Sequence, residues 1–185
     1  EIKIAQGAKQ TGGKLAAHKV SPAIAYYRNV EAYKDVFSPN RFPYANTIEE
    51  LFDFIGQLQK LSKKPVGVKI VISDIQNIEP YAKEIKKRID EINDSYPDYI
   101  AVDSGSGGSA TAPIEMMERV GLDVRDSVYL VDKVLRDYGV RDEVKLVASG
   151  KILTPDDIII IMSLGADFLQ IARGFMMSAG CIRAR

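Results

Sequence analysis

Apolar runs alternate along this sequence with segments whose apolar residues recur every three or four positions. Five short runs rich in β-branched residues are separated, from the second run onward, by one segment of helical length each. This alternation predicts βαβ units and therefore an α/β fold with a parallel sheet. The predicted strands are residues 2–6, 66–72, 99–103, 144–149 and 168–173.

The segments between the strands carry helix start signals. Thr47 and Glu50 have the spacing of a capping box, and Pro80 suits a first helical position. Thr154 and Pro155, followed by two aspartates, combine a cap, a proline and acids near the positive helix end. The predicted apolar faces comprise Ile48, Leu51, Phe52, Ile55 and Leu58; Tyr81, Ile85, Ile89 and Ile92; and Val124, Val128, Val131, Leu135 and Tyr138.

Residues 7–42 interrupt the alternation. This stretch is long and holds several glycines and prolines, and only residues 21–28 suit a short helix. Loops of such length in a compact domain usually lie over a site or are disordered. We therefore predict a functional loop here.

Composition excludes several classes of function. The 185 residues are 46% hydrophobic, and 25 Lys and Arg balance 25 Asp and Glu, so charge favours neither a nucleic-acid nor a membrane-surface partner. No apolar run is long enough to span a bilayer. The single cysteine, Cys181, excludes an internal disulfide and fits a reducing compartment. We expect a cytoplasmic protein.

Glycines mark the carboxyl ends of the last two strands, where parallel α/β folds place their active sites. Ser149 and Gly150 end the fourth run, and Arg173 and Gly174 end the fifth. Glycine lets backbone N–H groups approach an oxyanion, and arginine adds a charged fork. One such glycine more often marks an ordinary turn, but two consecutive units of this kind predict a phosphate site.

Other candidate residues are less specific. Lys69 lies inside an apolar strand, so it either faces a polar cavity or occupies an exposed strand position. Asp103 opens a Gly/Ser loop, residues 104–109, that either cradles a ligand or is a plain flexible connection. His18 is the only histidine, which excludes a histidine-based metal cluster and leaves a loop hydrogen bond or a catalytic role.

Several motifs carry a family resemblance over nearly the whole chain. Residues 3–25 contain KIAQGAK and HKVSPAIA, and residues 102–113 read VDSGSGGSATAP. VGVKIV surrounds Lys69, and ASGKILTPDDI, SLGAD and ARGFMMSAGCIRAR follow in order. This sequence resembles the FMN-binding glutamate synthase family, and in detail its stand-alone members more than the large multidomain enzyme.

The resemblance implies a (β/α)8 TIM barrel in which the five strands are strands 4 to 8. A complete barrel needs about 200 to 250 residues, so we expect an incomplete barrel in a single domain, residues 1–185. Lys69 and Gln6 would lie at the flavin ring, and Gly150, Gly174 and Arg173 would hold the phosphate. Further cofactor-binding residues would be Asp103, Gly107, Gly108 and Ser149, and Lys3, Lys9 and Ser109 would bind substrate.

The implied activity is that of an oxidoreductase of glutamate biosynthesis. Relatives reduce 2-iminoglutarate, formed from 2-oxoglutarate and ammonia, with hydride from reduced FMN, while the protein positions the flavin. An electron donor protein is a further expected partner. Lys69 and Gln6 are the expected catalytic residues.

The sequence also departs from the family. Relatives commonly read GGTGA after strand 6, whereas Ala110 replaces the last glycine here, which puts substrate preference in doubt. Relatives bind a 3Fe–4S cluster through three cysteines, of which Cys181 matches the first. One thiolate does not hold a cluster, so we expect it in the full-length protein only. Neither a glutaminase domain nor strands 1 to 3 occur in this sequence.

Two other interpretations stay open. One is a different FMN- or phosphate-binding barrel, such as a hydroxy-acid oxidase or an isomerase, although hydroxy-acid oxidases need a histidine after a late strand. The other is a non-catalytic half-barrel whose exposed edges lead to self-association.

Overall fold

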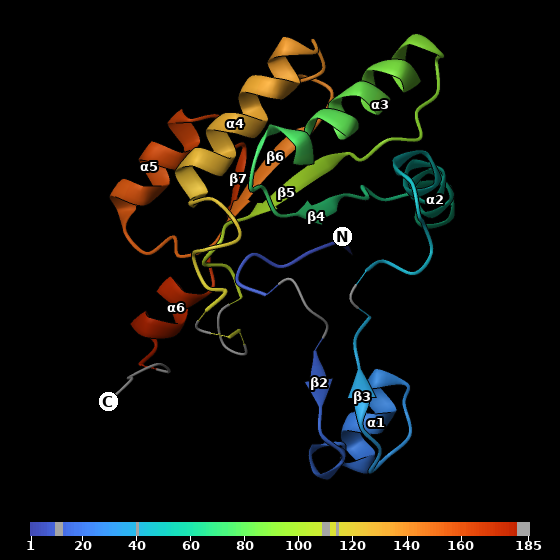
Figure 1. The fold of residues 1–185 in the computed structure, drawn as a ribbon, viewed down its shortest axis with the longest axis vertical. Helices are drawn as coiled ribbons and strands as arrows, with labels where there is room; N and C mark the ends of the chain where they lie inside the picture. The colour runs from blue at the N-terminus through green and yellow to red at the C-terminus, as the bar shows by residue number, and fades with distance from the viewer. Residues whose placement is uncertain (10–12, 40, 109–111, 114, 181–185) are drawn as a thin grey trace.

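A parallel five-stranded sheet forms the centre of the protein (Figure 1). The structure is a computed structural model that describes residues 1–9, 13–39, 41–108, 112–113 and 115–180. The strand order is β1-β4-β5-β6-β7, and every pair is parallel, as predicted. The strands are β1 Ile2–Lys3, β4 Val68–Ile70, β5 Tyr99–Asp103, β6 Lys145–Ser149 and β7 Phe168–Gln170.

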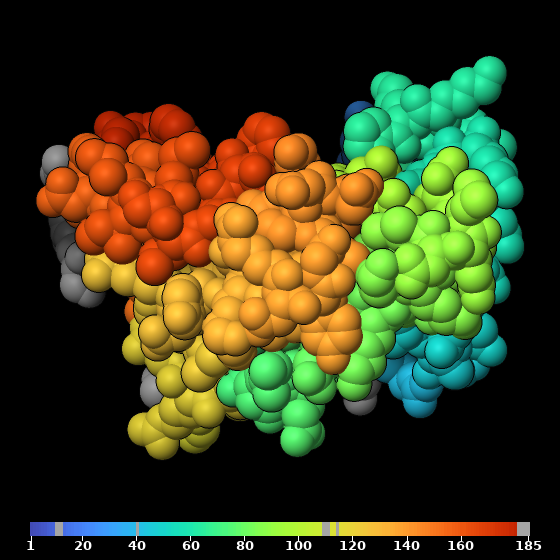
Figure 2. Space-filling model, turned by 90° about the horizontal axis from the view of Figure 1, so that it is seen from above, coloured from blue at the N-terminus to red at the C-terminus, as the bar shows by residue number. Residues whose placement is uncertain are grey.

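Helices cover one face of this sheet. Figure 1 shows α3, α4 and α5 on the same side, and Figure 2 shows them with α2 as one layer seen from above. Their apolar faces pack on the rung Ile2, Val68, Ile100 and Leu146, and all four residues are buried. No helix among the described residues has both the length and the apolar character needed to cross a membrane. The helices are α2 Ile48–Ser62, α3 Glu79–Asp90, α4 Val124–Asp137 and α5 Pro155–Ser163.

The opposite face of the sheet is concave. Its rungs alternate with the buried ones, so Lys3, Lys69 and Phe168 project there, and Phe168 is 59% exposed. The two edge strands lie across this face from each other, since Gln170 Nε2 donates to Glu1 Oε2 at 3.3 Å. A cavity of about 680 Å³ lies over the amino ends of β5 and β6, lined partly by Tyr99 and Phe168. The sheet is therefore strongly curved.

Several predicted boundaries need correction. Strand pairing of β1 stops at Lys3, because Ile4 and Ala5 both donate to Lys69 O and the chain then turns. β7 stops at Gln170, and Arg173 begins a short helix, α6 Arg173–Ser178, instead of ending a strand. Ile92 was wrongly placed on an apolar helix face: α3 ends at Asp90, and Ile92 has φ of 56° and is 93% exposed.

The predicted caps are confirmed in part. Thr47 accepts from the Glu50 amide, but the Glu50 carboxylate accepts from Asn46 N, so the reciprocal capping box expected there does not form. A capping box does form at α5 between Thr154 and Asp157. The capping box at α5 is complete because the Asp157 carboxylate accepts a hydrogen bond from the backbone amide of the cap residue, Thr154.

Residues 13–38 form an arm that projects from the α/β body (Figure 1). The predicted short helix is present as α1 Pro22–Arg28, capped by Ser21. The sequence did not predict the antiparallel pair β2 Lys14–Leu15 and β3 Val36–Phe37, nor the 3-10 helix η1 Ala17–Lys19 between them. Asp35 stabilises the arm, because it accepts from Ala17 N and pairs with Lys14 at 2.7 Å.

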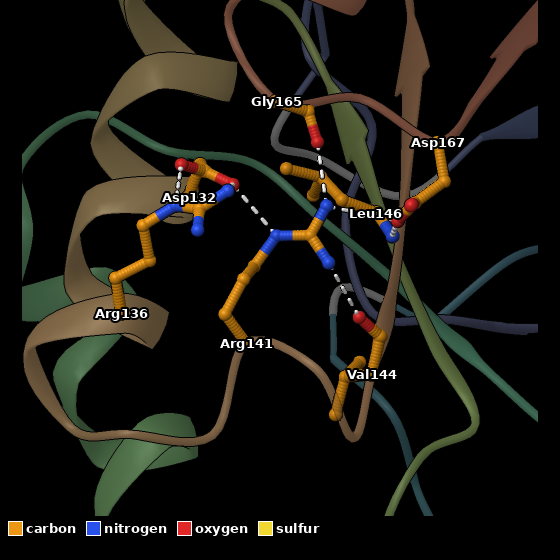
Figure 3. Close-up of polar contacts among 7 residues, drawn as sticks. All are labelled: Asp132, Arg136, Arg141, Val144, Leu146, Gly165 and Asp167. Atoms are coloured by element: carbon orange, nitrogen blue, oxygen red, sulfur yellow. Dashed lines mark hydrogen bonds and ion pairs between the residues drawn. The ribbon is translucent and has the colours of Figure 1, made fainter.

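A buried arginine joins α4 to the starts of β6 and β7 (Figure 3). Arg141 is 8% exposed and donates to Asp132 Oδ1 at 2.6 Å and Asp167 Oδ2 at 2.9 Å. It also donates to the carbonyl oxygens of Val144 and Gly165. Burial opposes ionisation of Asp132, but hydrogen bonds from Arg136 and Arg141 outweigh it and lower the pKa of this carboxyl. The network lies at the amino ends of the strands, away from the predicted site.

Candidate functional site

The carboxyl ends of β1, β5 and β6 meet at one buried carboxylate. Asp103 is 3% exposed and is the last residue of β5. Its Oδ2 accepts from Gly7 N at 2.9 Å, and its Oδ1 accepts from Ser149 Oγ at 3.0 Å. Three strand ends that are far apart in sequence are thus fixed to one another by a single side chain.

The turn after β1 is joined to the Gly/Ser loop by further hydrogen bonds. Ala8 N donates to Gly107 O at 2.9 Å, and Gln6 Nε2 donates to Gly108 O at 2.7 Å. Lys9 N donates back to Gln6 O, which closes the turn. The structure therefore brings Gln6, Lys9, Gly107 and Gly108 together.

Glycines allow the loops after β5 and β6 to pack at very short range. Gly150 has φ of +114°, which side chains of L-residues rarely adopt, and a Cβ there would lie 2.1 Å from Ser104 Oγ. A Cβ on Gly107 would lie 2.0 Å from Asp103 Oδ1. Glycine is therefore needed at both positions for the two loops to pack, and Gly107 N donates to Ser104 O at 2.7 Å within its own loop. An ion pair between Lys151 and Glu118 also joins the two loops.

Two lysines stand side by side on the concave face. Lys3 and Lys69 are partners in the β1–β4 register, and Lys69 is half-buried. Lys3 Nζ donates to Gln6 Oε1. Partial burial lowers the pKa of Lys3, and the charges of Lys69 and Lys9 lower it further, while Asp103 acts in the opposite direction. Like charges held this close favour an anionic ligand between them.

The end of β7 lies against the loop after β6. A Cβ on Gly174 would lie 3.4 Å from Ile152 O, two residues after Gly150. Arg173, directly before Gly174, is half-buried at the first position of α6. The amide groups before α5 are engaged locally: Asp157 accepts from Thr154 N and Leu153 N, and these bonds help lower the pKa of Asp157 to about 2. The start of α5 is therefore structural, as the sequence indicated.

Several residues singled out in the sequence are not part of this cluster. Ser109 and Cys181 lie outside the described residues, as does Ala110. His18 lies in η1 of the arm and is exposed. Within the described ranges, no three His, Cys, Asp or Glu side chains are grouped to hold a metal ion.

Sequence reasoning missed the structural importance of Gly7 and Ser104. A Cβ on Gly7 would lie 1.6 Å from Ser104 O, so the turn after β1 requires glycine. Ser104 N also donates to Ser149 O, and Ser104 is fully buried. Gly7 was visible only as a strand-ending glycine, because its contact is almost a hundred residues away in the chain.

Comparison with known proteins identifies the family. A family model described as a conserved region in glutamate synthase matches residues 1–185. A glutamate synthase large subunit-like protein of Bacillus subtilis, YerD, is 42% identical over 184 residues, which are 100% of this chain and 34% of that protein. The archaeal-type glutamate synthase [NADPH] of Thermotoga sp. is 34% identical over 98% of this chain and 34% of its own length.

A more distant relative is the ferredoxin-dependent glutamate synthase of Pyropia yezoensis, 31% identical over all of this chain and 12% of that enzyme. The chain thus spans about a third, or less, of the length of these relatives. Because the family model covers every residue, the chain belongs to the glutamate synthase family.

Proposed function

We propose that this chain is part of an FMN-dependent oxidoreductase of glutamate synthase type, which reduces 2-iminoglutarate, formed from 2-oxoglutarate and ammonia, to glutamate. Family membership supports the reaction class. One structural observation carries the proposal to this site: the glycine backbones at the ends of β5 and β6 pack together beside a pair of lysines on the concave face. We also propose a cytoplasmic location.

The described residues fit the phosphate and ring of FMN. Gly150 has φ of +114° and leaves no room for a Cβ, so the turn after β6 consists of backbone without a side chain, as helix-start anion sites commonly do. In this proposal Gly150, Gly174 and Arg173 hold the phosphate, with Ser149 and Gly108 beside it, and Lys69 and Gln6 lie at the ring. Bound FMN would supply the hydride, and these residues would hold and orient it.

The substrate carboxylates would bind to Lys3 and Lys9, with Ser109 as a further contact. The charges of Lys69 and Lys9 both act on Lys3, so positive charge is concentrated around Lys3, where a dicarboxylate would enter. A 3Fe–4S cluster does not fit this chain by itself, since it has one cysteine. We place the cluster and an electron donor protein with the full-length protein only.

We further propose that the sheet forms strands 4 to 8 of a (β/α)8 barrel. Its concave face would be the barrel interior, which in such barrels is filled by side chains from all strands. The Glu1–Gln170 contact across this face and the cavity beside Tyr99 support the curvature that a barrel needs. Association between copies of the isolated chain through its edge strands is a related prediction, tested by size-exclusion chromatography.

The full-length protein offers the direct test of the function. It should purify with flavin absorbance, release FMN on denaturation, and form glutamate from 2-oxoglutarate and ammonia when the flavin is reduced chemically. A protein that cannot be loaded with FMN would contradict the proposal. A flavoprotein that oxidises 2-hydroxy acids instead would support the competing oxidase interpretation, against which this chain has no histidine at its late strand ends.

Arg173→Ala in the full-length protein should weaken FMN binding by about tenfold or more, because a charge-assisted contact to phosphate is lost. Titration of the apoprotein with FMN, followed by flavin fluorescence, measures the dissociation constant. Arg125→Ala is the matched control, since Arg125 pairs with Asp157 at an exposed position of α4. Equal FMN affinity in Arg173→Ala and parent would exclude the phosphate role.

Lys69→Met should lower the two-electron potential of the flavin by about 30 mV or more, equivalent to a tenfold change in the equilibrium. A cation beside the ring stabilises the anionic reduced form, and methionine keeps the volume without the charge. Spectroelectrochemical titration gives the potential, with the exposed Lys64→Met as control. An unchanged potential would show that Lys69 does not face the ring.

A further inference from the structure

We propose that Asp103 is a positioning residue that acts on the flavin site through the backbone of Gly7 and the side chain of Ser149. The proposal rests on the proposed function for its effect on FMN, but the positioning itself concerns this chain alone. It assigns Asp103 an indirect role in place of a direct cofactor contact.

The contacts of Asp103 carry this inference. Each carboxylate oxygen accepts a hydrogen bond from a different strand end, Oδ2 from Gly7 N at 2.9 Å and Oδ1 from Ser149 Oγ at 3.0 Å. The side chain is buried beneath Gly107, where a Cβ would lie 2.0 Å from Oδ1. The carboxylate therefore faces protein groups, and the loop backbone lies over it.

A buried carboxylate is costly unless its oxygens are hydrogen-bonded, so this one has a structural purpose. The groups that it holds are those that present backbone to the site. Gly7 continues into Ala8, which donates to Gly107 O, and Ser149 continues into Gly150. Loss of the Asp103 contacts would release the turn after β1 and the end of β6 together.

Asparagine and alanine distinguish positioning from a direct effect of charge. In Asp103→Asn, Oδ1 can accept from Gly7 N while Nδ2 donates to Ser149 Oγ, since a hydroxyl both donates and accepts. Asp103→Ala removes both contacts. If Asp103 only positions the loops, asparagine should largely restore what alanine loses, although the negative charge is gone.

The first measurement is hydrogen exchange of the Gly7 amide, followed by NMR or mass spectrometry of the full-length protein. We expect exchange at Gly7 to accelerate about tenfold or more in Asp103→Ala and to stay within about threefold of the parent in Asp103→Asn. FMN affinity should follow the same order, and the potential of Asp103→Asn should equal that of the parent. Ser149→Ala, which removes one of the two contacts, should accelerate exchange at Gly7 less than Asp103→Ala does, and this variant serves if Asp103→Ala does not fold.

Asp132→Asn is the control, because it perturbs a buried carboxylate at the other end of the sheet. It should lower the melting temperature while leaving exchange at Gly7 and FMN affinity unchanged. Unchanged exchange at Gly7 in Asp103→Ala would overturn the positioning role. A shifted potential, or an equal loss of FMN, in Asp103→Asn would overturn it in favour of a direct charge effect. Absence of FMN from the parent would refute the proposed function alone, and the exchange data would still decide the role of Asp103.

Discussion

Arg141→Met should lower the free energy of unfolding by about 3 to 5 kcal/mol, the range found when one partner of a buried ion pair is removed. Arg141 is buried and donates to Asp132, Asp167 and two backbone carbonyls. Methionine fills similar space, but it leaves the carboxylates with fewer donors and the Val144 and Gly165 oxygens without theirs. Chemical denaturation of parent and variant gives the difference in free energy.

The pH dependence of that difference gives an internal check. The pKa of Asp132 lies below its ordinary 3.8 in the folded protein, so its stabilising contribution is present above about pH 4 and is lost as the pH falls through the folded value. The gap between parent and Arg141→Met should therefore narrow at acid pH. Lys133→Met, on an exposed ion pair of the same helix, should barely change the melting temperature. If Arg141→Met destabilises the protein no more than Lys133→Met does, the network in Figure 3 contributes little to stability.

Gly7→Ala should destabilise the protein by about 1 to 3 kcal/mol and abolish measurable FMN binding, because overpacking here displaces the site itself. The new Cβ would lie 1.6 Å from Ser104 O, a backbone atom that cannot rotate away. The turn after β1 must then separate from the Gly/Ser loop, which breaks the Gly7 contact to Asp103. Thermal unfolding and FMN titration measure the two effects.

Gly13→Ala is the matched control in the same segment of the chain. The nearest atoms to a Cβ there are Ser38 Oγ at 3.6 Å and Lys9 Nζ at 3.7 Å, which is ordinary contact. We expect this variant to keep the stability and FMN affinity of the parent. Normal FMN binding by Gly7→Ala would show that the site tolerates movement of the turn.

Local pattern was enough to predict the centre of the fold. Residues 99–103 are entirely apolar up to Asp103 and formed the predicted strand, since a strand buried on both faces reads as a continuous run. The cap at Thr154 and the proline after it placed α5 correctly. Glycines and charged residues at the strand ends also indicated the candidate site, because parallel strands bring these ends to one edge.

Features that depend on distant contacts were beyond local pattern. The strands of the arm are two residues long and mixed in polarity, so no periodicity marks them. The constraint on Gly7 comes from Ser104, and Arg141 finds its acceptors on α4 and just before β7. Arg173 was assigned to a strand because Ile171 and Ala172 extend the apolar run, although pairing ends earlier.

Gly7, Asp103 and Ser149 are far apart in sequence, so the hydrogen bonds between them can form only in a fixed order while the chain is synthesised. The turn at Gly7 acquires its anchor only after about a hundred further residues are made, and the anchor is complete only when Ser149 has been made. Closing such long loops is slow, because the chain loses conformational entropy before the stabilising contacts form. Until Ser149 has been made, the turn at Gly7 has no complete anchor, so this part of the site cannot close before that point.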